Sequence, residues 1–167
     1  KNFNIEILYE EKLLGTAGTL YENLNDFKYN DLMVIHCDNF TSFDLNDLIN
    51  AHKQRPKKCE ISMLTFKTSK PTQSGIVITD KNKILKEYYE KPDYPPGNIA
   101  NAAIYILSKK FLNEKYSEFG GYKDFASEVI PKLTNKIFTY KTDDFFIDIG
   151  DTTSLNIAKE WLKNNKI

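Results

Sequence analysis

Hydrophobic and polar positions along the chain follow two periods in alternation. Alternating or continuous apolar runs predict strands at 4–10, 31–37, 60–66, 75–79, 83–89, 99–107, 137–140 and 145–149. Apolar residues spaced three and four apart predict helices at 15–25, 42–55, 122–133 and from 153 onward, with a short helix after 108. Strands that alternate with helices indicate a three-layer α/β domain with a mainly parallel, mixed sheet.

One β-hairpin interrupts this alternation. Residues 75–79 and 83–89 both have the pattern of strands, and the polar turn Asp80-Lys81-Asn82 between them is typical of a hairpin. The chain shows neither an internal repeat nor a linker, and its 167 residues are enough to bury about two-thirds of the unfolded surface. We therefore interpret residues 1–167 as a single domain with a hairpin insertion.

Charge and composition exclude several classes of function. The 23 lysines and arginines balance the 23 aspartates and glutamates, so no overall field gathers nucleic acid or an anionic membrane. No run approaches the roughly 20 apolar residues of a membrane span. Cys37 and Cys59 lack the spacing of a zinc site or a disulfide framework and are interpreted as reduced thiols, with a cytoplasmic location as the default. Arg55 is the only arginine in these 167 residues, so they offer almost no means of binding phosphate through two parallel hydrogen bonds from an arginine.

Two aspartates follow predicted strands directly. Asp38 comes after the apolar run 32–37, and Asp148 comes after the run 145–147. In open α/β sheets, ligands bind outside the carboxyl ends of the strands. Two carboxylates that converge there can hold Mg²⁺, which prefers oxygen ligands and bridges substrate phosphates. Taken alone, each aspartate is also typical of a turn or a cap, and that interpretation stays open.

Two further segments have the residue types of a binding site. In the turn that contains Gly15 and Gly18, the missing Cβ atoms let the backbone approach a flat ring or a ribose closely. The sequence Glu90-Lys91-Pro92 follows a strand and can place a carboxylate on sugar hydroxyls and an ammonium on a phosphate. Each segment by itself also fits a simpler interpretation, the first as a chain-reversing turn and the second as a solvated ion pair.

These pieces occur in an order that is more specific than any one of them. The chain resembles the sugar-phosphate nucleotidyltransferases, the nucleotide-sugar pyrophosphorylase family, from near its first residue to its last. The matching landmarks are Leu14-Gly15-Thr16-Ala17-Gly18, Asp38, Gly75, Glu90-Lys91-Pro92, Asn101-Ala102-Ala103-Ile104-Tyr105 and Asp148-Ile149-Gly150. The resemblance implies a Rossmann-like nucleotidyltransferase domain that joins a sugar 1-phosphate to a nucleoside triphosphate and releases pyrophosphate, for nucleotide-sugar and polysaccharide biosynthesis.

The resemblance also implies roles for individual residues. It assigns the catalytic Mg²⁺ to Asp38 and Asp148, and it assigns the phosphate of the sugar to Lys91 as a third catalytic group. It places the remaining contacts of the sugar pocket at Gly75, Glu90 and Asn101. It places the nucleotide against the loop formed by Leu14, Gly15, Thr16 and Gly18.

The identity of the base depends on one side chain. Glu10 lies five residues before Gly15, where relatives that bind uracil or thymine often have glutamine. A carboxylate only accepts hydrogen bonds and can take both N–H donors of guanine, whereas a pyrimidine edge needs a donor as well. GTP is therefore the triphosphate that we predict. The sugar stays open among heptose, mannose, glucose and amino-sugar 1-phosphates.

The resemblance is incomplete on the amino-terminal side. The family opens with a strand, a Gly-x-Gly-Thr-Arg loop and a nearby Pro-Lys that grip the triphosphate, and these 167 residues contain no such segment. Arg55, directly before Pro56, cannot be the arginine of that loop. We therefore expect the first βαβ unit to be absent, the domain to be incomplete and these residues alone to make no nucleotide sugar. The sheet edges exposed in this way invite a homo-oligomer.

Two other functions remain open at this point. A metal-dependent glycosyltransferase shares the α/β architecture, although Asp38-Asn39-Phe40 stands where such enzymes usually have Asp-x-Asp. A non-catalytic regulatory subunit that binds nucleotide and sugar phosphate fits the missing loop. The retention of both predicted metal aspartates argues against that second function.

Overall fold

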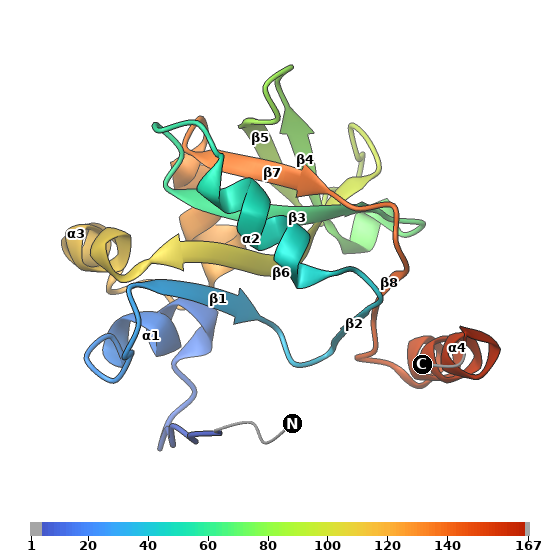
Figure 1. The fold of residues 1–167 in the computed structure, drawn as a ribbon, viewed down its shortest axis with the longest axis horizontal. Coiled ribbons are helices and arrows are strands. Elements are labelled where there is room, and N and C mark those ends of the chain that lie inside the picture. The colour runs from blue at the N-terminus through green and yellow to red at the C-terminus, as the bar shows by residue number, and fades with distance from the viewer. Residues whose placement is uncertain (1–4, 166–167) are drawn as a thin grey trace.

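The structure is a computed structural model that describes residues 5–165 (Figure 1). These residues form, in order, α1 (Gly15–Glu22), β1 (Asp31–Ile35), β2 (Asn39–Thr41), α2 (Leu45–Lys53), β3 (Ile61–Lys67), β4 (Gly75–Thr79), β5 (Leu85–Glu90), β6 (Ile99–Ser108), α3 (Lys109–Phe119), β7 (Ile137–Lys141), β8 (Phe146–Asp148) and α4 (Thr152–Asn165). Three short helical turns lie between them, η1 (Pro71–Gln73), η2 (Phe125–Val129) and η3 (Ile130–Leu133). None of the helices within residues 5–165 has the length and apolar character that crossing a bilayer requires.

β6 lies inside a six-stranded sheet with the order β5-β4-β6-β3-β7, and β1 also pairs with β6. The α/β fold class and the β4–β5 hairpin are confirmed. The sheet is mixed, as expected, but the share of parallel pairs is smaller than predicted. Among residues 5–165 only β3 and β7 are parallel neighbours, and the other ladders of this sheet are antiparallel. The reason is that β6 enters between β1 and β3 and runs against both.

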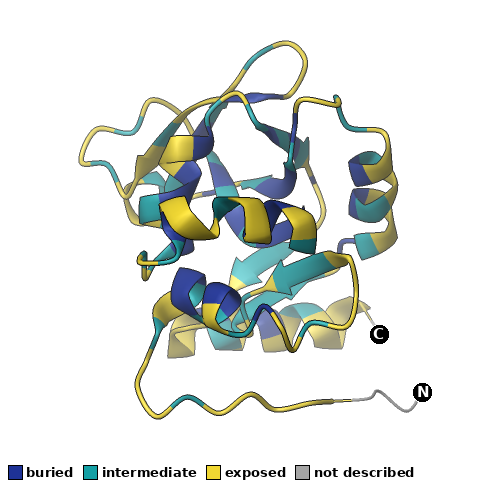
Figure 2. Ribbon diagram, turned by 90° about the vertical axis from the view of Figure 1, so that its left-hand side faces the viewer, coloured by how far each residue is buried: buried dark blue, intermediate teal, exposed yellow. Residues whose placement is uncertain are grey.

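Helices cover both faces of the sheet and give the predicted three layers. On one face α1, α3, η2 and η3 pack against a core that includes Leu20 and Phe125. On the other face α2 buries Leu48 against Leu64 and Ile104, and Figure 1 shows α2 crossing in front of the sheet. Figure 2 shows the buried positions concentrated between these layers, with the exposed ones on the outer sides of the helices and in the loops.

The predicted first strand is wrong. Residues 5–10 form neither strand nor helix, and Asn4 lies outside the described residues. Ile5, Ile7 and Tyr9 are 78%, 88% and 86% exposed, so their alternation covers no core. A strand becomes stable when a neighbouring strand accepts its hydrogen bonds, and within residues 5–165 no strand pairs with this segment.

The helix predicted at 122–133 begins at Phe125 in the structure, and residues 125–133 do not form one α-helix. η2 is a π-helix capped by Asp124, whose carboxylate accepts a hydrogen bond from Ser127 N at 2.7 Å. η3 follows as a 3₁₀-helix with Pro131 in its first turn. Proline has no backbone N–H to donate and its ring clashes with the preceding turn, so a regular α-helix does not continue through this position.

A two-stranded ribbon carries the chain away from the main sheet. β2 pairs antiparallel with β8, and Asn39 stands opposite Asp148 in this ladder. The side-chain amide of Asn39 donates to the carbonyl of Ala102 at 2.7 Å, which ties the ribbon to β6. Phe145, just before β8, stacks on Trp161 of α4 with ring centroids 4.9 Å apart. The ribbon is therefore held between the sheet and the last helix.

Candidate functional site

The two strand-end aspartates lie next to each other on the β2–β8 ribbon. β1 ends at Ile35 and a tight turn carries Asp38 to the start of β2, while Asp148 ends β8. The backbone carbonyl of Asp38 accepts a hydrogen bond from Ile149 N at 2.8 Å. A Cβ on Gly150 would lie 2.9 Å from Asp148 Oδ1 and 3.8 Å from Asp38 Oδ2. Both carboxylates therefore reach the space beside this glycine.

The chemistry of these two donors fits a magnesium ion. Carboxylates supply the hard oxygen ligands that Mg²⁺ prefers. Asp148 is exposed and Asp38 is half-buried, so oxygens from a substrate and from water can reach the same point. Among the described residues, no cluster of three or more histidine, cysteine, aspartate or glutamate side chains can hold a metal ion. Two carboxylates leave positions open for substrate phosphates, which is how Mg²⁺ is usually bound.

A cavity of about 240 Å³ lies next to Asp148. The predicted sugar-site residues Gly75, Glu90, Lys91 and Asn101 all line this cavity. They come from three strands and one turn, and the β4–β5 ladder places Gly75 opposite Glu90. The structure thus brings the predicted sugar-phosphate residues and a predicted metal ligand together around one cavity.

Lys91 has an uncommon backbone conformation at the edge of this cavity. Its φ of 44° is in the left-handed region, and its N–H donates to the carbonyl of Ser74 at 3.3 Å. Its ammonium lies 4.0 Å from Glu90 Oε1, and its side chain is 67% exposed. An exposed ion pair of this kind contributes little stability, whereas the backbone conformation costs about 1–3 kcal/mol. Strain that stability does not explain is typical of functional sites.

Asn101 is partly engaged within β6. Its Nδ2 donates to the hydroxyl of Tyr105 at 2.6 Å, and its Oδ1 accepts a hydrogen bond from Ala103 N at 2.9 Å. Ala103 has a φ of 50° and lies where the β3–β6 register shifts. A further hydrogen bond joins the amide to the side chain of Tyr88. An amide oxygen has two lone pairs, so one of them remains at Asn101 for a ligand.

The predicted nucleotide loop does not line the cavity, but it is tied to the cavity wall. Gly15 has a φ of 79°, and a Cβ there would lie 2.4 Å from the carbonyl oxygen of Lys123. The hydroxyl of Thr16 donates to Asp124 Oδ2 at 3.3 Å and accepts from Phe125 N at 2.8 Å. Asp124 itself lines the cavity. Gly15 therefore permits the close packing of α1 against the segment before η2.

Glu10 organises the start of α1. Its Oε1 accepts a hydrogen bond from the hydroxyl of Thr19 at 2.6 Å, and its Oε2 accepts one from Leu14 N at 3.3 Å. Gly18 is buried in α1, and a Cβ there would approach the Leu14 side chain to 3.0 Å. Within the chain these residues cap and pack the loop, and their contact with a nucleotide stays a prediction.

Six polar residues that line the cavity were not predicted as site residues: His36, Asn39, Gln73, Ser74, Tyr88 and Asp124. Tyr88 had a signal, because it stands two residues before Glu90 and alternate residues of a strand face the same side. Asp124 had none, because its place at the cavity depends on contacts between segments more than 100 residues apart. A sequence pattern reports local periodicity and does not contain such distances.

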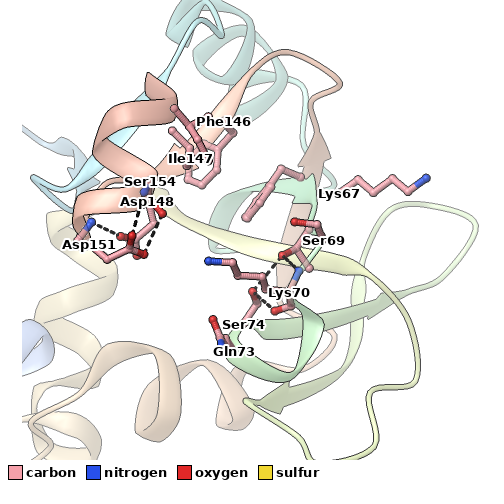
Figure 3. A pocket seen from close by; sticks show the side chains of 14 residues that line it. Lys67, Ser69, Lys70, Gln73, Ser74, Phe146, Ile147, Asp148, Asp151 and Ser154 are labelled. Atoms are coloured by element: carbon pink, nitrogen blue, oxygen red, sulfur yellow. Dashed lines mark hydrogen bonds between the residues drawn. The ribbon is translucent and has the colours of Figure 1, made fainter. Parts of the chain in front are cut away.

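A second cavity, of about 320 Å³, shares Asp148 with the first. Figure 3 shows side chains that line this second cavity. The loop after β3 provides Lys70 and Gln73 on one side, and Asp148 and Asp151 lie on the other. Asp151 accepts hydrogen bonds from the N and Oγ of Ser154 at 2.8 and 2.9 Å, so it caps α4. Asp148 is therefore accessible from two cavities, while Asp151 is committed to the helix.

The family follows from a comparison with known proteins. A family model described as nucleotidyl transferase matches residues 1–165. The chain belongs to the nucleotidyl transferase family. This confirms the resemblance that was inferred from the order of the motifs. Sugar-1-phosphate nucleotidyltransferases are among the relatives of the chain within this family.

Two curated relatives are glucose-1-phosphate adenylyltransferases. The protein of Thermosipho africanus is 27% identical over 145 residues, which cover 81% of this chain and 35% of the relative. The protein of Mycoplasma mobile is 24% identical over 163 residues, which cover 91% of this chain and 43% of the relative. The chain thus spans less than half the length of either relative.

Two solved structures share the fold of this chain. HddC from Yersinia pseudotuberculosis superimposes with a TM-score of 0.74 at 22% identity, and the match covers 92% of this chain and 64% of HddC. A structure of HddC complexed with GMP-PN gives a TM-score of 0.71 at 22% identity over the same shares of both chains. These matches confirm the Rossmann-like α/β fold.

Proposed function

We propose that this chain provides the metal-holding and sugar-phosphate-binding part of an enzyme that joins a sugar 1-phosphate to a nucleoside triphosphate. One observation carries the proposal: Asp38 and Asp148 reach one point beside Gly150, and Asp148 also lines the cavity that contains Glu90 and Lys91. Membership of the family and the adenylyltransferase relatives support it. The products are a nucleotide-diphosphate sugar and pyrophosphate.

The reaction asks for little covalent chemistry from the protein. An oxygen of the sugar 1-phosphate attacks the α-phosphorus of the triphosphate in line, and the bond from that phosphorus to the β-phosphate oxygen breaks. Asp38 and Asp148 would hold Mg²⁺, which supplies neutralisation of phosphate charge when bound. Lys91 contacts the incoming phosphate as a point charge. Positioning of the reactants and neutralisation of phosphate charge therefore account for the acceleration of the reaction.

The sugar occupies the cavity of about 240 Å³ in this proposal. Glu90 accepts hydrogen bonds from sugar hydroxyls, since a carboxylate is an acceptor only. Asn101 offers the remaining lone pair of its amide oxygen to the same ring. Gly75 leaves the wall between β4 and β5 free of a side chain. The cavity thus offers acceptor oxygens for sugar hydroxyls and, at Lys91, an ammonium for the phosphate.

The nucleotide lies against the loop of Leu14, Gly15, Thr16 and Gly18 in this proposal, and we predict GTP. Each carboxylate oxygen of Glu10 already accepts one hydrogen bond within the chain and keeps a further lone pair for a base. HddC, which shares the fold, was crystallised with GMP-PN, whereas the curated relatives are adenylyltransferases. A panel of GTP, ATP, UTP and dTTP tests the base, and a preference for any triphosphate other than GTP contradicts the prediction.

Substitution of the two aspartates tests the proposed function. The experiment uses the complete gene product, because this chain spans less than half of its relatives. Asp38→Asn and Asp148→Asn should each lower Mg²⁺-dependent pyrophosphate release by about 100-fold or more, because an amide loses the charge that holds the metal. Asp151→Asn is the matched control and should keep wild-type turnover, because asparagine still caps α4.

Two outcomes would reject this function. If both aspartate variants keep wild-type turnover, the metal assignment is wrong. If the wild-type protein binds sugar phosphate but releases no pyrophosphate with any triphosphate, a non-catalytic binding subunit replaces the enzyme. A transfer of sugar from a nucleotide sugar to an acceptor would instead identify a glycosyltransferase.

We propose that the protein is cytoplasmic, which the free thiols of Cys37 and Cys59 support. We also propose a homo-oligomer, which the exposed apolar side chains of Ile7, Tyr9 and Leu13 support. Sedimentation velocity over a range of concentrations measures the assembly, and a monomer at every concentration contradicts it.

A further inference from the structure

Tyr88 and Glu90 point into the same cavity from one face of β5. They stand two residues apart on the strand, and both line the cavity that also contains Gly75 and Asn101. The hydroxyl of Tyr88 donates to Glu90 Oε2 at 2.5 Å. The ring of Tyr88 packs against the main hydrophobic core, so the hydroxyl is presented from a rigid position. One oxygen of Glu90 is thereby held by the protein.

Gly75 makes room for this pair. The β4–β5 ladder places Gly75 opposite Glu90 and Val77 opposite Tyr88. A Cβ on Gly75 would lie 2.0 Å from the Tyr88 hydroxyl oxygen and 2.9 Å from Glu90 Oε2. Real side chains cannot approach so closely, so the tyrosine–glutamate pair occupies the space that any other residue at position 75 would fill. The glycine, the tyrosine and the glutamate form one unit of the cavity wall.

The phenol of Tyr88 keeps the proton that this hydrogen bond needs. Burial raises the pKa of Tyr88 well above its ordinary value, and the hydrogen bond to Glu90 raises it further. A hydrogen bond with Asn101 lowers the pKa of Tyr88, but this effect is smaller than the two that raise it. Tyr88 is therefore a donor toward Glu90 throughout the pH range in which the protein works.

We propose that Tyr88 is a positioning residue that fixes Glu90 for the sugar. With Oε2 held by Tyr88, Oε1 is the oxygen left to accept a hydrogen bond from a ring hydroxyl of the substrate. A free glutamate has several rotatable bonds and loses their freedom when it binds a ligand, whereas Glu90 is already held. The ligand class is a sugar 1-phosphate with an unmodified hydroxyl facing Glu90. This inference rests on the proposed function.

Removal of one oxygen atom tests the inference. In the complete gene product, Tyr88→Phe should raise the KM for the sugar 1-phosphate about tenfold and leave kcat within about twofold, because the lost contact acts on substrate binding. The KM for the triphosphate should not change. Tyr89→Phe is the matched control: its hydroxyl donates to Glu87 and neither residue lines the cavity, so all constants should stay at wild-type values.

A double-mutant cycle separates positioning from a general structural role. If Tyr88 acts through Glu90, then Tyr88→Phe should have no further effect on the KM in a Glu90→Gln background. Circular dichroism and the urea midpoint of each variant verify that the fold is intact. The inference is overturned if Tyr88→Phe leaves the KM unchanged. It is equally overturned if the KM effects of Tyr88→Phe and Glu90→Gln multiply, or if Tyr89→Phe raises the KM as much as Tyr88→Phe.

The failure of the inference differs from the failure of the proposed function. An active wild-type protein with an unaffected Tyr88→Phe variant rejects only the role of Tyr88. A wild-type protein that transfers no nucleotide to any sugar 1-phosphate rejects the function and the role together. A deoxy sugar 1-phosphate that lacks the hydroxyl facing Glu90 gives an independent readout, because Tyr88→Phe should no longer raise its KM.

Discussion

Two residues at the candidate site, Lys91 and Ala103, have backbone conformations that side chains with a Cβ rarely adopt. Lys91 directly follows β5, and Ala103 lies at the register shift of β6, so both conformations follow from how the strands bend around the cavity. The strain at Lys91 accompanies a charged group that the proposed reaction uses. Ala103 has no ionisable side chain, so the cost of its conformation is measured as a change in stability.

Ala103→Gly should stabilise the protein by up to about 1 kcal/mol, because glycine adopts a positive φ without the clash of a Cβ. Urea-induced unfolding measures the change. The neighbouring Ala102→Gly is the control and should lower the free energy of unfolding by about 1 kcal/mol, because Ala102 is buried at an ordinary strand conformation. Equal losses in both variants would show that Ala103 is not strained.

At the scale of elements, α2 and β3 are joined by a buried polar contact. His52 of α2 is 6% exposed, and its Nδ1 is hydrogen-bonded to the Ser62 hydroxyl of β3 at 2.8 Å. Burial and the charge of Arg55 lower the pKa of His52 to about 4, against the opposing effect of Asp31. In the folded protein His52 is therefore neutral at pH values where a free histidine gains a proton.

This contact predicts a pH dependence of stability. Between pH 6.5 and about 4 the unfolded chain binds a proton at His52 that the folded chain does not, so the free energy of unfolding should fall as the pH is lowered through this window. His52→Gln should flatten the curve there, whereas His36→Gln should retain it. Unfolding curves in urea at half-unit pH steps provide the measurement, and identical slopes for His52→Gln and wild type contradict the prediction.

The contact between α1 and η2 predicts a second pH effect, in a lower window. Burial acts to raise the pKa of Asp124, but hydrogen bonds from Ser127 and Thr16 outweigh it, and the pKa lies below the ordinary 3.8. The stability that these bonds provide is complete above pH 3.8 and is lost as the pH falls through the folded-state pKa. Asp124→Asn should remove the loss of stability below pH 3.8, which unfolding curves in urea at low pH measure. If the free energy of unfolding of the variant falls with pH as steeply as that of the wild type, the assignment to Asp124 is wrong.

At the scale of the whole molecule, the candidate site gathers parts of the chain that are distant in sequence. The cavity draws on β4, β5, β6, the ribbon and the segment before η2. A ligand that bridges these parts binds the folded chain and not the unfolded one, so it stabilises the entire fold. Binding should therefore be visible in global unfolding even without turnover.

MgCl₂ together with glucose 1-phosphate should raise the melting temperature of the protein by several degrees. At a ligand concentration 100 times the dissociation constant the gain is about 2.7 kcal/mol, and each kcal/mol is worth about 2–4 °C for a protein of this size. Differential scanning fluorimetry measures the shift. EDTA should remove the contribution of the metal, and Asp148→Asn should show a smaller shift than Asp151→Asn. No shift in the wild-type protein with glucose, mannose or heptose 1-phosphate contradicts binding at this cavity.

Local patterns in the chain were enough to predict most helices and strands and the chemistry that they carry. Apolar periodicity located α2, β3, the hairpin, β6 and α4, because burial of one face acts within each element. The same reading located Asp38, Asp148, Glu90 and Lys91, because strand ends and turns mark where side chains leave the core. It failed at residues 5–10, because an alternating pattern does not contain the partner strand that hydrogen bonding requires.

Which of these residues meet follows from the three-dimensional fold. It placed Asp38 beside Asp148 through the β2–β8 ribbon, and it inserted β6 between β1 and β3 so that most ladders became antiparallel. It also placed Gly75 of β4 against the Tyr88–Glu90 pair of β5. Such contacts depend on how strands pair over long sequence distances, and the periodicity of a single chain carries no information on that pairing.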